Sequence, residues 1–181
     1  MKPLHTSQTS MIFFAVLSTD KPFFDAAIQK LTDKYGMPFE VLLPQSFEHT
    51  SYYKDEMGSD LIKGFIAFQP PFDQSKLPQA KCWARAIEWS LGSHCEKMFH
   101  RSVNIDPGLV TLEKIVLATS KNFSHRLYLG DGVYGEVTLI FHTECWETLN
   151  WTYPDYKVPD IQKFLIRCRN HLKEYLSKQT S

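Results

Sequence analysis

Residues 11–17 read Met-Ile-Phe-Phe-Ala-Val-Leu, a continuous apolar run of the length of one β-strand. An apolar run without alternating polar residues is typical of a strand in the middle of a sheet that is covered on both faces. The run follows a polar ten-residue segment and is soon followed by Asp20 and Lys21, so its flanks are not those of a signal peptide. We therefore expect residues 1–10 to form a flexible tail and residues 11–17 to form a central strand.

The segment after this strand predicts a helix that ends at Gly36. Asp20 is a suitable cap for its first turn, and Pro22 stands where a missing N–H costs nothing. The apolar residues at helical spacing are Phe24, Ala27, Ile28, Leu31 and Tyr35. Because glycine favours the left-handed conformation that ends many helices, the helix should stop at Gly36.

Four more elements follow along the chain. Apolar runs predict strands at residues 39–43 and 61–68. Residues 78–91 begin at a proline, stop before a glycine and carry apolar residues at helical spacing, which predicts a helix. A last apolar stripe, from Ile161 to Leu176, predicts a C-terminal helix that packs on the sheet.

The order strand, helix, strand, strand, helix predicts an α+β fold. It matches the start of a ferredoxin-like, split β-α-β arrangement on an antiparallel or mixed sheet. The chain has 181 residues and a mass of 21.0 kDa, with no internal repeat and no linker-like segment. We therefore expect residues 1–181 to form a single α+β domain.

Composition and charge exclude several classes of protein. A hydrophobic content of 43% with 14% aromatic residues excludes a disordered chain, and no apolar run approaches the roughly 18 residues of a membrane span. The 20 Lys and Arg residues balance 20 Asp and Glu residues, so no global field gathers nucleic acid or anionic lipid. We therefore expect neither a dedicated nucleic-acid binder nor a membrane protein.

The cysteines favour reduced thiols in a cytoplasmic protein. They form no C-x-x-C pair, and structural disulfides belong to oxidising compartments. The four cysteines are Cys82, Cys95, Cys145 and Cys168. A zinc site built from Cys82, His94, Cys95 and His100 would not have the spacing of a standard structural site, so we expect no metal.

Two runs of alternating apolar residues on either side of residues 130–132 predict a β-hairpin within residues 124–142. A two-residue loop would mix leucine and charge on each face of the hairpin. A three-residue loop, with Gly132 in the left-handed conformation, separates them, as a half-buried sheet requires. We therefore expect the three-residue loop.

This loop fixes which residues share a face of the hairpin. The cross-strand pairs are Arg126 with Glu136 and Tyr128 with Tyr134. The buried face carries Leu127, Leu129, Val133, Val137, Leu139 and Phe141. The other face carries Arg126, Tyr128, Tyr134, Glu136 and Thr138.

The Arg126–Glu136 pair has two interpretations. As a surface ion pair it would contribute about 0–1 kcal/mol to stability and have no further role. On a concave polar sheet face, Arg126 would instead bind a phosphate or carboxylate, and Glu136 would orient the ligand. Lys114, Lys121 and His125 would add positive charge from neighbouring segments.

Asn104 and Asp106 belong to the segment Asn-Ile-Asp-Pro-Gly, which ends at Gly108. The backbone preferences of Asp, Pro and Gly predict a turn here. The second interpretation is that both side chains bind a metal or a ribose.

An enzyme is the alternative to a binding protein. His125 or Glu136 would act as general acid or base, and Lys114, Lys121 and Arg126 would stabilise developing charge. In the three-residue loop, however, His125 falls on the apolar side of the hairpin, which weakens it as a partner of Glu136.

Standard motifs of catalysis and nucleotide binding are absent from the sequence. It contains no G-x-x-x-x-G-K-[ST], no G-x-S-x-G and no H-E-x-x-H. Gly130-x-Gly132-x-x-Gly135 has the spacing of a dinucleotide fingerprint, but it lies between two strands instead of between a strand and a helix. The sequence therefore leaves the identity of any cofactor open.

Several strings of residues carry a resemblance to a known family. They are Asn104-x-Asp106-Pro107-Gly108, Thr111-Leu112-x-Lys114, Leu117-Ala118-Thr119-x-Lys121, Ser124-His125-Arg126-x-Tyr128-Leu129-Gly130, Tyr134-x-Glu136-Val137-Thr138-Leu139 and Trp151-Thr152-Tyr153-Pro154-Asp155-Tyr156. In these strings the chain resembles a bacterial family of uncharacterised proteins of similar length, a domain of unknown function whose members are often labelled "GTP-binding protein". The resemblance covers nearly the whole chain and implies no established activity.

The resemblance favours a shared anion-binding site among the matched polar residues. These residues are Lys114, Lys121, His125, Arg126, Glu136 and Asp155. Residues 151–156 would form either an aromatic lid over that site or a loop pinned to the core by Trp151 and Pro154. We therefore expect a small anionic ligand, either a nucleotide or another phosphorylated or carboxylated metabolite, with the enzyme as the alternative.

Overall fold

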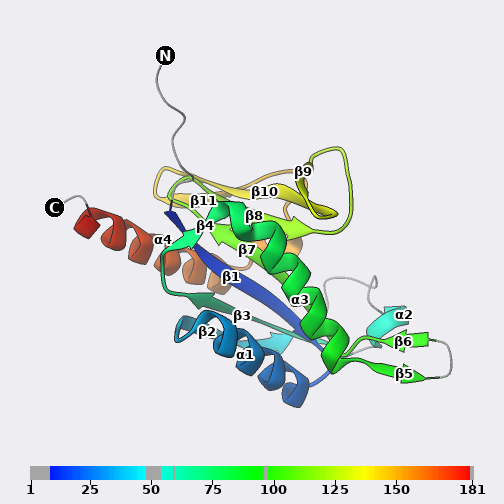
Figure 1. Cartoon of the computed structure of the whole chain (residues 1–181). Coiled ribbons are helices and arrows are strands. Elements are labelled where there is room, and N and C mark those ends of the chain that lie inside the picture. The colour runs from blue at the N-terminus through cyan, green and yellow to red at the C-terminus, as the bar shows by residue number, and fades with distance from the viewer. Residues whose placement is uncertain (1–8, 48–53, 59, 96–97, 180–181) are drawn as a thin grey trace.

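The computed structural model describes residues 9–47, 54–58, 60–95 and 98–179. Over these residues the chain has an α+β fold, in which one antiparallel sheet of nine strands carries helices on both faces (Figure 1). The sheet order is β11-β10-β8-β7-β1-β3-β2, with β4 paired to β1 and β9 paired to β10, while β5 and β6 form a separate ribbon. None of the described helices is long and apolar enough to cross a membrane.

The elements have the following bounds. The helices are α1 (Lys21–Tyr35), α2 (Lys54–Met57), α3 (Leu77–Leu91) and α4 (Pro159–Gln179). The first strands are β1 (Thr9–Ser18), β2 (Pro38–Ser46), β3 (Ile62–Phe68), β4 (Phe72–Asp73), β5 (Ser93–Cys95) and β6 (Met98–His100). The later strands are β7 (Val103–Val110), β8 (Lys114–Thr119), β9 (Leu127–Gly130), β10 (Val133–His142) and β11 (Cys145–Thr148).

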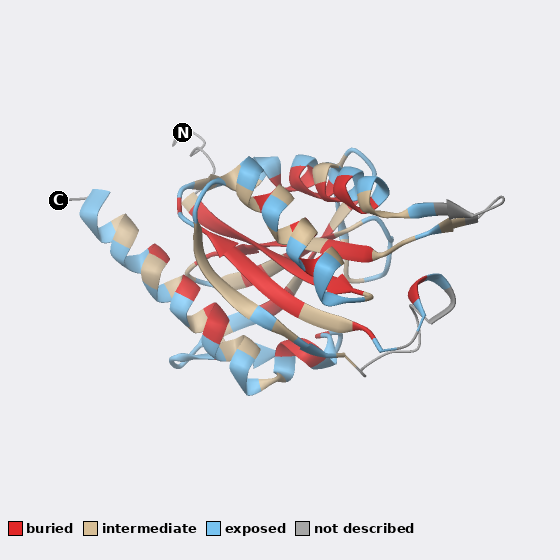
Figure 2. Ribbon diagram, turned by 90° about the horizontal axis from the view of Figure 1, so that it is seen from below, coloured by how far each residue is buried: buried red, intermediate tan, exposed pale blue. Residues whose placement is uncertain are grey.

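Strand β1 is the central strand that residues 11–17 predict. It lies between β3 and β7 and is buried along nearly its whole length. Phe13 and Ala15 pack in the cluster under α4, whereas Phe14 and Val16 pack in the cluster under α1 and α3. Figure 2 shows these buried strands between the helices. Both faces of β1 are therefore covered, as predicted.

The helices follow from local signals. Oδ1 of Asp20 accepts a hydrogen bond from the N–H of Phe23 at 2.9 Å and so caps α1. Gly36, with a φ of 85°, follows its last residue. The C-terminal helix α4 packs on the sheet through Phe164 and Leu165, as predicted. The ferredoxin-like description of the first elements stays a prediction.

Strands β9 and β10 form the predicted hairpin with a different loop. The strands pair directly on either side of residues 131–132, whose φ angles of 54° and 72° are the positive values that a two-residue hairpin turn needs. A bulge at Leu129 then restores the predicted pairing of Tyr128 with Tyr134. The three-residue loop is wrong, and the tyrosine pair is confirmed.

The burial predicted for β9 is also wrong. Leu127 and Leu129 are 75% and 41% exposed, and Tyr128 between them is exposed as well. Strand β9 has four residues, and among the described strands it pairs with β10 alone. Leu129 folds over Gly135 of β10, where a Cβ would lie 2.7 Å from its Cδ1. The short edge strand therefore packs on its neighbour and not into the core.

A second bulge, at Thr138, interrupts β10. Because the alternation shifts there, Leu139 lies in the cluster under α4, while Val133 lies in a different cluster with residues of α3 and β8. The prediction that Val133 and Leu139 share one face is therefore wrong. Glu136 and Thr138 are both buried, so this part of the predicted polar face is not an open surface.

Candidate functional site

A cleft of about 990 Å³ opens where strands β7 and β8 part. The two strands pair only between residues 108–110 and 115–117. The earlier part of β7 stays with β1, whereas the last residues of β8 continue beside β10. Helix α3 and the turn at residues 153–156 supply further lining. The cleft thus collects side chains from segments that are far apart in the chain.

The segment from Asn104 to Gly108 is part of β7 and not the predicted turn. Its turn preference is overridden by pairing with β1 along the whole of β7. Gly108 lies so close to Phe13 that a Cβ there would be 2.4 Å from the ring. Because side chains alternate along a strand, Asn104 and Asp106 project to the same side, and both line the cleft.

Charged side chains of both signs line the cleft. The cations are Lys63, Lys81, Arg85, Arg101, Lys121 and Arg126. The carboxylates are Glu56, Glu88, Asp106, Glu136 and Asp155. A ligand in this cleft would meet an array of fixed charges, most of them held by one another.

The predicted contact between Arg126 and Glu136 is present. Nε of Arg126 donates to Oε2 of Glu136 at 2.7 Å, and their side chains are 10% and 1% exposed. The other two guanidinium nitrogens donate to the Lys121 carbonyl at 2.9 Å and to the Tyr153 hydroxyl at 2.8 Å. Burial, followed by the charge of Glu136, raises the pKa of Tyr153. This pair is therefore part of a buried network and not an exposed ion pair.

His125 also contacts Glu136, contrary to the expectation from the hairpin pattern. Its Nε2 lies 3.0 Å from Oε2 of Glu136, and its ring stacks on Trp151 with centroids 4.9 Å apart. The alternation of faces does not apply to His125, because β9 begins only at Leu127. His125 is not among the residues that line the cleft, so it contacts Glu136 without lining the cleft itself.

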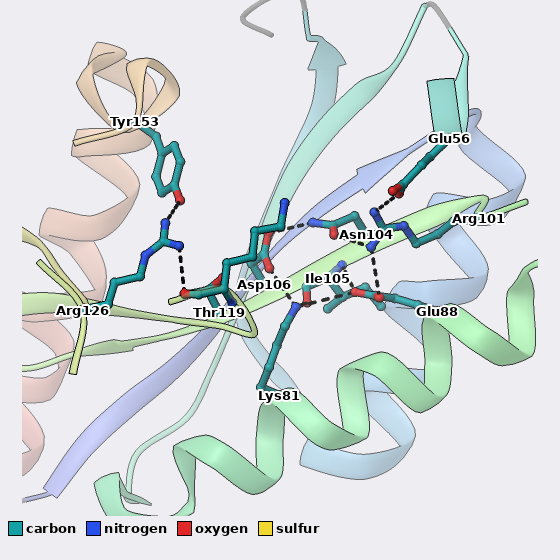
Figure 3. A network of polar contacts seen from close by, with 11 residues as sticks. Glu56, Lys81, Glu88, Arg101, Asn104, Ile105, Asp106, Thr119, Arg126 and Tyr153 are labelled. Atoms are coloured by element: carbon teal, nitrogen blue, oxygen red, sulfur yellow. Dashed lines mark hydrogen bonds and ion pairs between the residues drawn. The ribbon is translucent and has the colours of Figure 1, made fainter. Parts of the chain in front are cut away.

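A second network, on α3 and β7, was not predicted from the sequence (Figure 3). Nζ of Lys81 donates to Oδ1 of Asp106 and to the Ile105 carbonyl, both at 2.8 Å. Oε1 of Glu88 accepts from the Ile105 N–H at 2.7 Å and lies 3.7 Å from Nζ of Lys81. Nδ2 of Asn104 donates to Oδ2 of Asp106 at 2.7 Å. These contacts fix Asn104 and Asp106 against α3.

Arg101 extends this network toward α2. Its Nη1 donates to Oδ1 of Asn104 at 3.0 Å and lies 3.5 Å from Oε2 of Glu88, and its Nη2 donates to Glu56. Lys81 and Glu88 lie seven positions apart on the buried face of α3, beside Ala84. In the sequence, Lys81 and Glu88 could have been recognised as charged residues on an otherwise apolar helical stripe.

Burial and charge shift two carboxyl groups of this network in opposite directions. Burial raises the pKa of Glu88 above its usual value, although Lys81 opposes the shift. Burial also acts to raise the pKa of Asp106, but the ammonium groups of Lys81 and Lys63 outweigh it, so the pKa of Asp106 is lowered. Asp106 therefore keeps its carboxylate to lower pH than usual, whereas Glu88 takes up a proton at higher pH than usual.

A third contact places Asp155 in the cleft. Its Oδ2 accepts from Nζ of Lys63 at 2.5 Å, and the Asp155 side chain is buried. Nζ of Lys63 also lies 5.0 Å from the centre of the Phe47 ring and 5.8 Å from that of Tyr156. Lys63 was not predicted, because it stands within an otherwise apolar strand.

The loop at residues 151–156 is pinned to the sheet, which is one of its two predicted roles; the aromatic lid stays a prediction. Nε1 of Trp151 donates to the Val137 carbonyl at 2.7 Å, and Oγ1 of Thr152 donates to the Thr138 carbonyl at 2.6 Å. These bonds pin the loop to β10. The same loop supplies Tyr153 and its neighbours to the cleft.

Three predicted ligand residues lie outside the cleft lining. They are Lys114, Tyr128 and Tyr134. Tyr128 and Tyr134 pack edge to face with centroids 5.3 Å apart, and the Tyr128 hydroxyl accepts from the Gly132 N–H. Lys114 begins β8, at the opposite end from Thr119, which lines the cleft. Arg126 is therefore framed by Tyr153 instead of the hairpin tyrosines.

Within the described part of the chain, no group of three or more His, Cys, Asp or Glu side chains is arranged to hold a metal ion. The side chains of His94 and Cys95, which belong to the zinc alternative, lie outside the described residues.

Comparison with known proteins gives one match. A family model described as a domain of unknown function (DUF4416) matches residues 8–172. No curated protein and no solved structure matches the chain.

Proposed function

Since the chain belongs to the DUF4416 family, a domain of unknown function, we propose from the cleft itself that it binds a small anionic metabolite whose carboxylate or phosphate contacts Arg126. The single observation that carries this proposal is the position of the Arg126 guanidinium on the cleft wall. A nucleotide or another phosphorylated or carboxylated metabolite is the ligand class.

The guanidinium of Arg126 is held ready for such a ligand. It has five N–H groups, and three of them are used by Glu136, Lys121 and Tyr153. Two N–H groups of Arg126 have no partner among the described residues. They suit the planar oxygen pairs of a carboxylate or phosphate. Because the three existing bonds already fix the side chain, little conformational entropy is lost when a ligand binds.

The size and lining of the cleft also support a metabolite. Its volume of about 990 Å³ is at the upper end of small-molecule sites, which span roughly 300–1,000 Å³. Lys121 and Arg85 bring further positive charge to the lining. The stacked rings of Trp89 and Phe99, with centroids 4.5 Å apart, add an aromatic surface that suits a nucleobase.

An enzyme is the second candidate. The observation that favours it is the contact of His125 with Glu136, because a carboxylate oriented by an imidazole is a common acid–base arrangement. In this version Glu136 faces the substrate, His125 positions it and Arg126 stabilises developing charge. Turnover of a ligand that is found to bind, and its loss in Glu136→Gln, would distinguish an enzyme from a binding protein.

A binding screen tests the proposal. Nucleotides, sugar phosphates and small carboxylates are screened by thermal shift on the full chain, and each hit is measured by titration calorimetry. We expect a hit that raises the melting temperature of the wild type but binds Arg126→Lys at least tenfold more weakly, since lysine keeps the charge and loses the planar fork.

Arg167→Lys is the matched control, because Arg167 of α4 pairs with Glu40 of β2 and neither residue lines the cleft. It should bind the hit as tightly as the wild type. A screen without a hit on folded protein, or a hit that binds Arg126→Lys normally, contradicts the proposal.

A further inference from the structure

The hydroxyl of Tyr153 lies directly beside the guanidinium of Arg126. Nη2 of Arg126 donates to the Tyr153 hydroxyl oxygen at 2.8 Å, and both residues line the cleft. Figure 3 shows the Tyr153 ring reaching from its loop to the tip of the Arg126 side chain. A group that contacts this part of Arg126 therefore stands next to the Tyr153 hydroxyl as well.

This hydroxyl has a proton to donate. A phenol oxygen can accept one hydrogen bond while its O–H donates another. Because the Tyr153 oxygen accepts from Arg126, its own O–H points away from the guanidinium, and no described residue accepts from it. Tyr153 is 41% exposed, so a molecule in the cleft can reach its side chain. The O–H is therefore left for water or for a ligand.

Tyr153 keeps this proton at neutral pH. Burial is the main cause that raises the pKa of Tyr153, and the charge of Glu136 adds to it, while Arg126 opposes the shift. The hydrogen bond from the Arg126 cation also polarises the phenol, and hydrogen bonds in such a chain strengthen one another. Tyr153 is thus a strong donor at the place where the proposed anion binds.

The loop holds Tyr153 in this position without a ligand. Its neighbours Trp151 and Thr152 donate to carbonyls of β10 at 2.7 and 2.6 Å. The Tyr153 carbonyl accepts from the Tyr156 N–H at 3.1 Å. Because the backbone on both sides is fixed, little conformational entropy is lost when a ligand accepts from the hydroxyl.

The directions of the donors decide which kind of group can use both. The two hydrogens on one nitrogen of a planar guanidinium point about 120° apart. One hydrogen of Nη2 points at Tyr153, so an oxygen that accepts from the other lies about 5 Å from the Tyr153 oxygen at ordinary hydrogen-bond lengths. A second oxygen on the same centre, as in a carboxylate or phosphate, closes this gap. A group with a single oxygen does not.

We propose that Tyr153 and Arg126 bind the anionic group of the ligand together, with Tyr153 donating its O–H to one oxygen and Arg126 donating to another. This rests on the proposed function, in which Arg126 binds the anion. It makes Tyr153 a ligand-binding residue, and it restricts the anionic group to oxyanions that carry at least two oxygens on one centre.

Methyl phosphate and acetate are the probes, each titrated into the full chain and followed by NMR. Tyr153→Phe keeps the ring and removes the O–H. It should weaken the binding of a probe about tenfold or more, as the loss of a hydrogen bond to a charged group does. Tyr134→Phe is the matched control, because Tyr134 lies outside the cleft lining, and it should bind as the wild type does.

The probe that binds identifies the anionic group. Binding of methyl phosphate alone indicates a phosphate, and binding of acetate alone indicates a carboxylate. The loss in Tyr153→Phe supports the proposal in either case.

The Arg126→Lys background separates direct binding from positioning. If Tyr153 only held Arg126 in place, adding Tyr153→Phe to Arg126→Lys would cost no further affinity. We expect the added substitution to weaken binding about tenfold again, because Tyr153 contacts the anion itself. A double variant that binds as well as Arg126→Lys overturns the inference.

The remaining outcomes separate this inference from the proposed function. Binding that is weakened in Arg126→Lys and unchanged in Tyr153→Phe overturns the role of Tyr153 and leaves the anion site at Arg126 standing. Binding that is unchanged in both variants, or no binding of either probe to the folded wild type, overturns both proposals.

Discussion

Oε2 of Glu136 accepts from Nε of Arg126 at 2.7 Å, on a carboxylate whose side chain is 1% exposed. Glu136 lies on β10, which pairs with β8, β9 and β11. Arg126 reaches Glu136 from the segment before β9. A buried carboxylate of this kind depends on its partners, because the loss of solvation is large. The pair therefore links the stability of the fold to the geometry of the cleft.

Replacing Arg126 alone should destabilise the protein strongly. Arg126→Ala leaves the Glu136 charge buried with His125 as its remaining partner, and we expect a loss of about 3–5 kcal/mol in the free energy of unfolding. The double variant Arg126→Ala/Glu136→Gln removes the buried charge and should recover part of this loss. Urea denaturation measures both. If Arg126→Ala lost less free energy of unfolding than the double variant, the burial of Glu136 would not depend on Arg126.

The lowered pKa of Asp106 predicts a pH dependence with a definite sign. In the folded state its pKa is below the usual value of 3.8, so the unfolded chain binds more protons just below that pH. The stabilisation is complete above the unfolded pKa and is lost as pH falls through the folded pKa. Asp106→Asn should therefore cost about 1–2 kcal/mol near neutral pH, and this cost should shrink in acid.

Urea unfolding of the wild type and Asp106→Asn over a series of pH values gives the comparison for Asp106. Asp160→Asn is the control, because Asp160 is an exposed residue of α4. A difference between wild type and Asp106→Asn that grows as pH falls would have the wrong sign.

Glu88 should show the opposite pH dependence. Its pKa in the folded state is raised above the usual value of 4.5, so the folded protein binds more protons in the window above that pH. Stability contributed by Glu88 therefore decreases as pH rises from the unfolded pKa through the folded one. Glu88→Gln keeps an acceptor for the Ile105 N–H and removes the titration.

The measurable quantity is the free energy of unfolding of Glu88→Gln minus that of the wild type. It should increase with pH in the window between the unfolded and folded pKa of Glu88 and then level off. A difference that is constant over this window would show that burial of Glu88 does not shift its pKa.

Local signals were sufficient for much of the fold. The apolar run of β1, the Asp20 cap and Gly36 act within a few residues, and each determines the structure at its own position. The pairing of Tyr128 with Tyr134 also followed from alternation. The bulges at Leu129 and Thr138 could not be predicted, because each depends on how β10 meets its neighbouring strands.

The segment from Asn104 to Gly108 shows the opposite case. Its residues favour a turn, but tertiary pairing with β1 makes it a strand. The Arg126–Glu136 contact was predicted because both residues belong to one hairpin. Lys81 and Lys63 come from α3 and β3, and only the folded sheet brings them to the same cleft.

The unpartnered hydroxyl of Tyr156 predicts an unusual result for the ligand-free protein. Removal of a buried hydroxyl normally costs stability, because a hydrogen bond is lost. Among the described residues the Tyr156 hydroxyl has no hydrogen-bond partner, so Tyr156→Phe removes an unsatisfied polar atom and should raise the free energy of unfolding by about 1 kcal/mol. Thr152→Val is the matched comparison, since Oγ1 of Thr152 bonds to the Thr138 carbonyl at 2.6 Å and to the Leu149 N–H at 2.7 Å.

Thermal melts and urea denaturation without ligand measure both substitutions. Thr152→Val should lose about 1–3 kcal/mol, because two buried backbone groups lose their partner. If Tyr156→Phe also lost stability on this scale, the Tyr156 hydroxyl would have a partner in the free protein. A gain in Tyr156→Phe together with a loss in Thr152→Val means that the fold buries this hydroxyl without a hydrogen-bond partner.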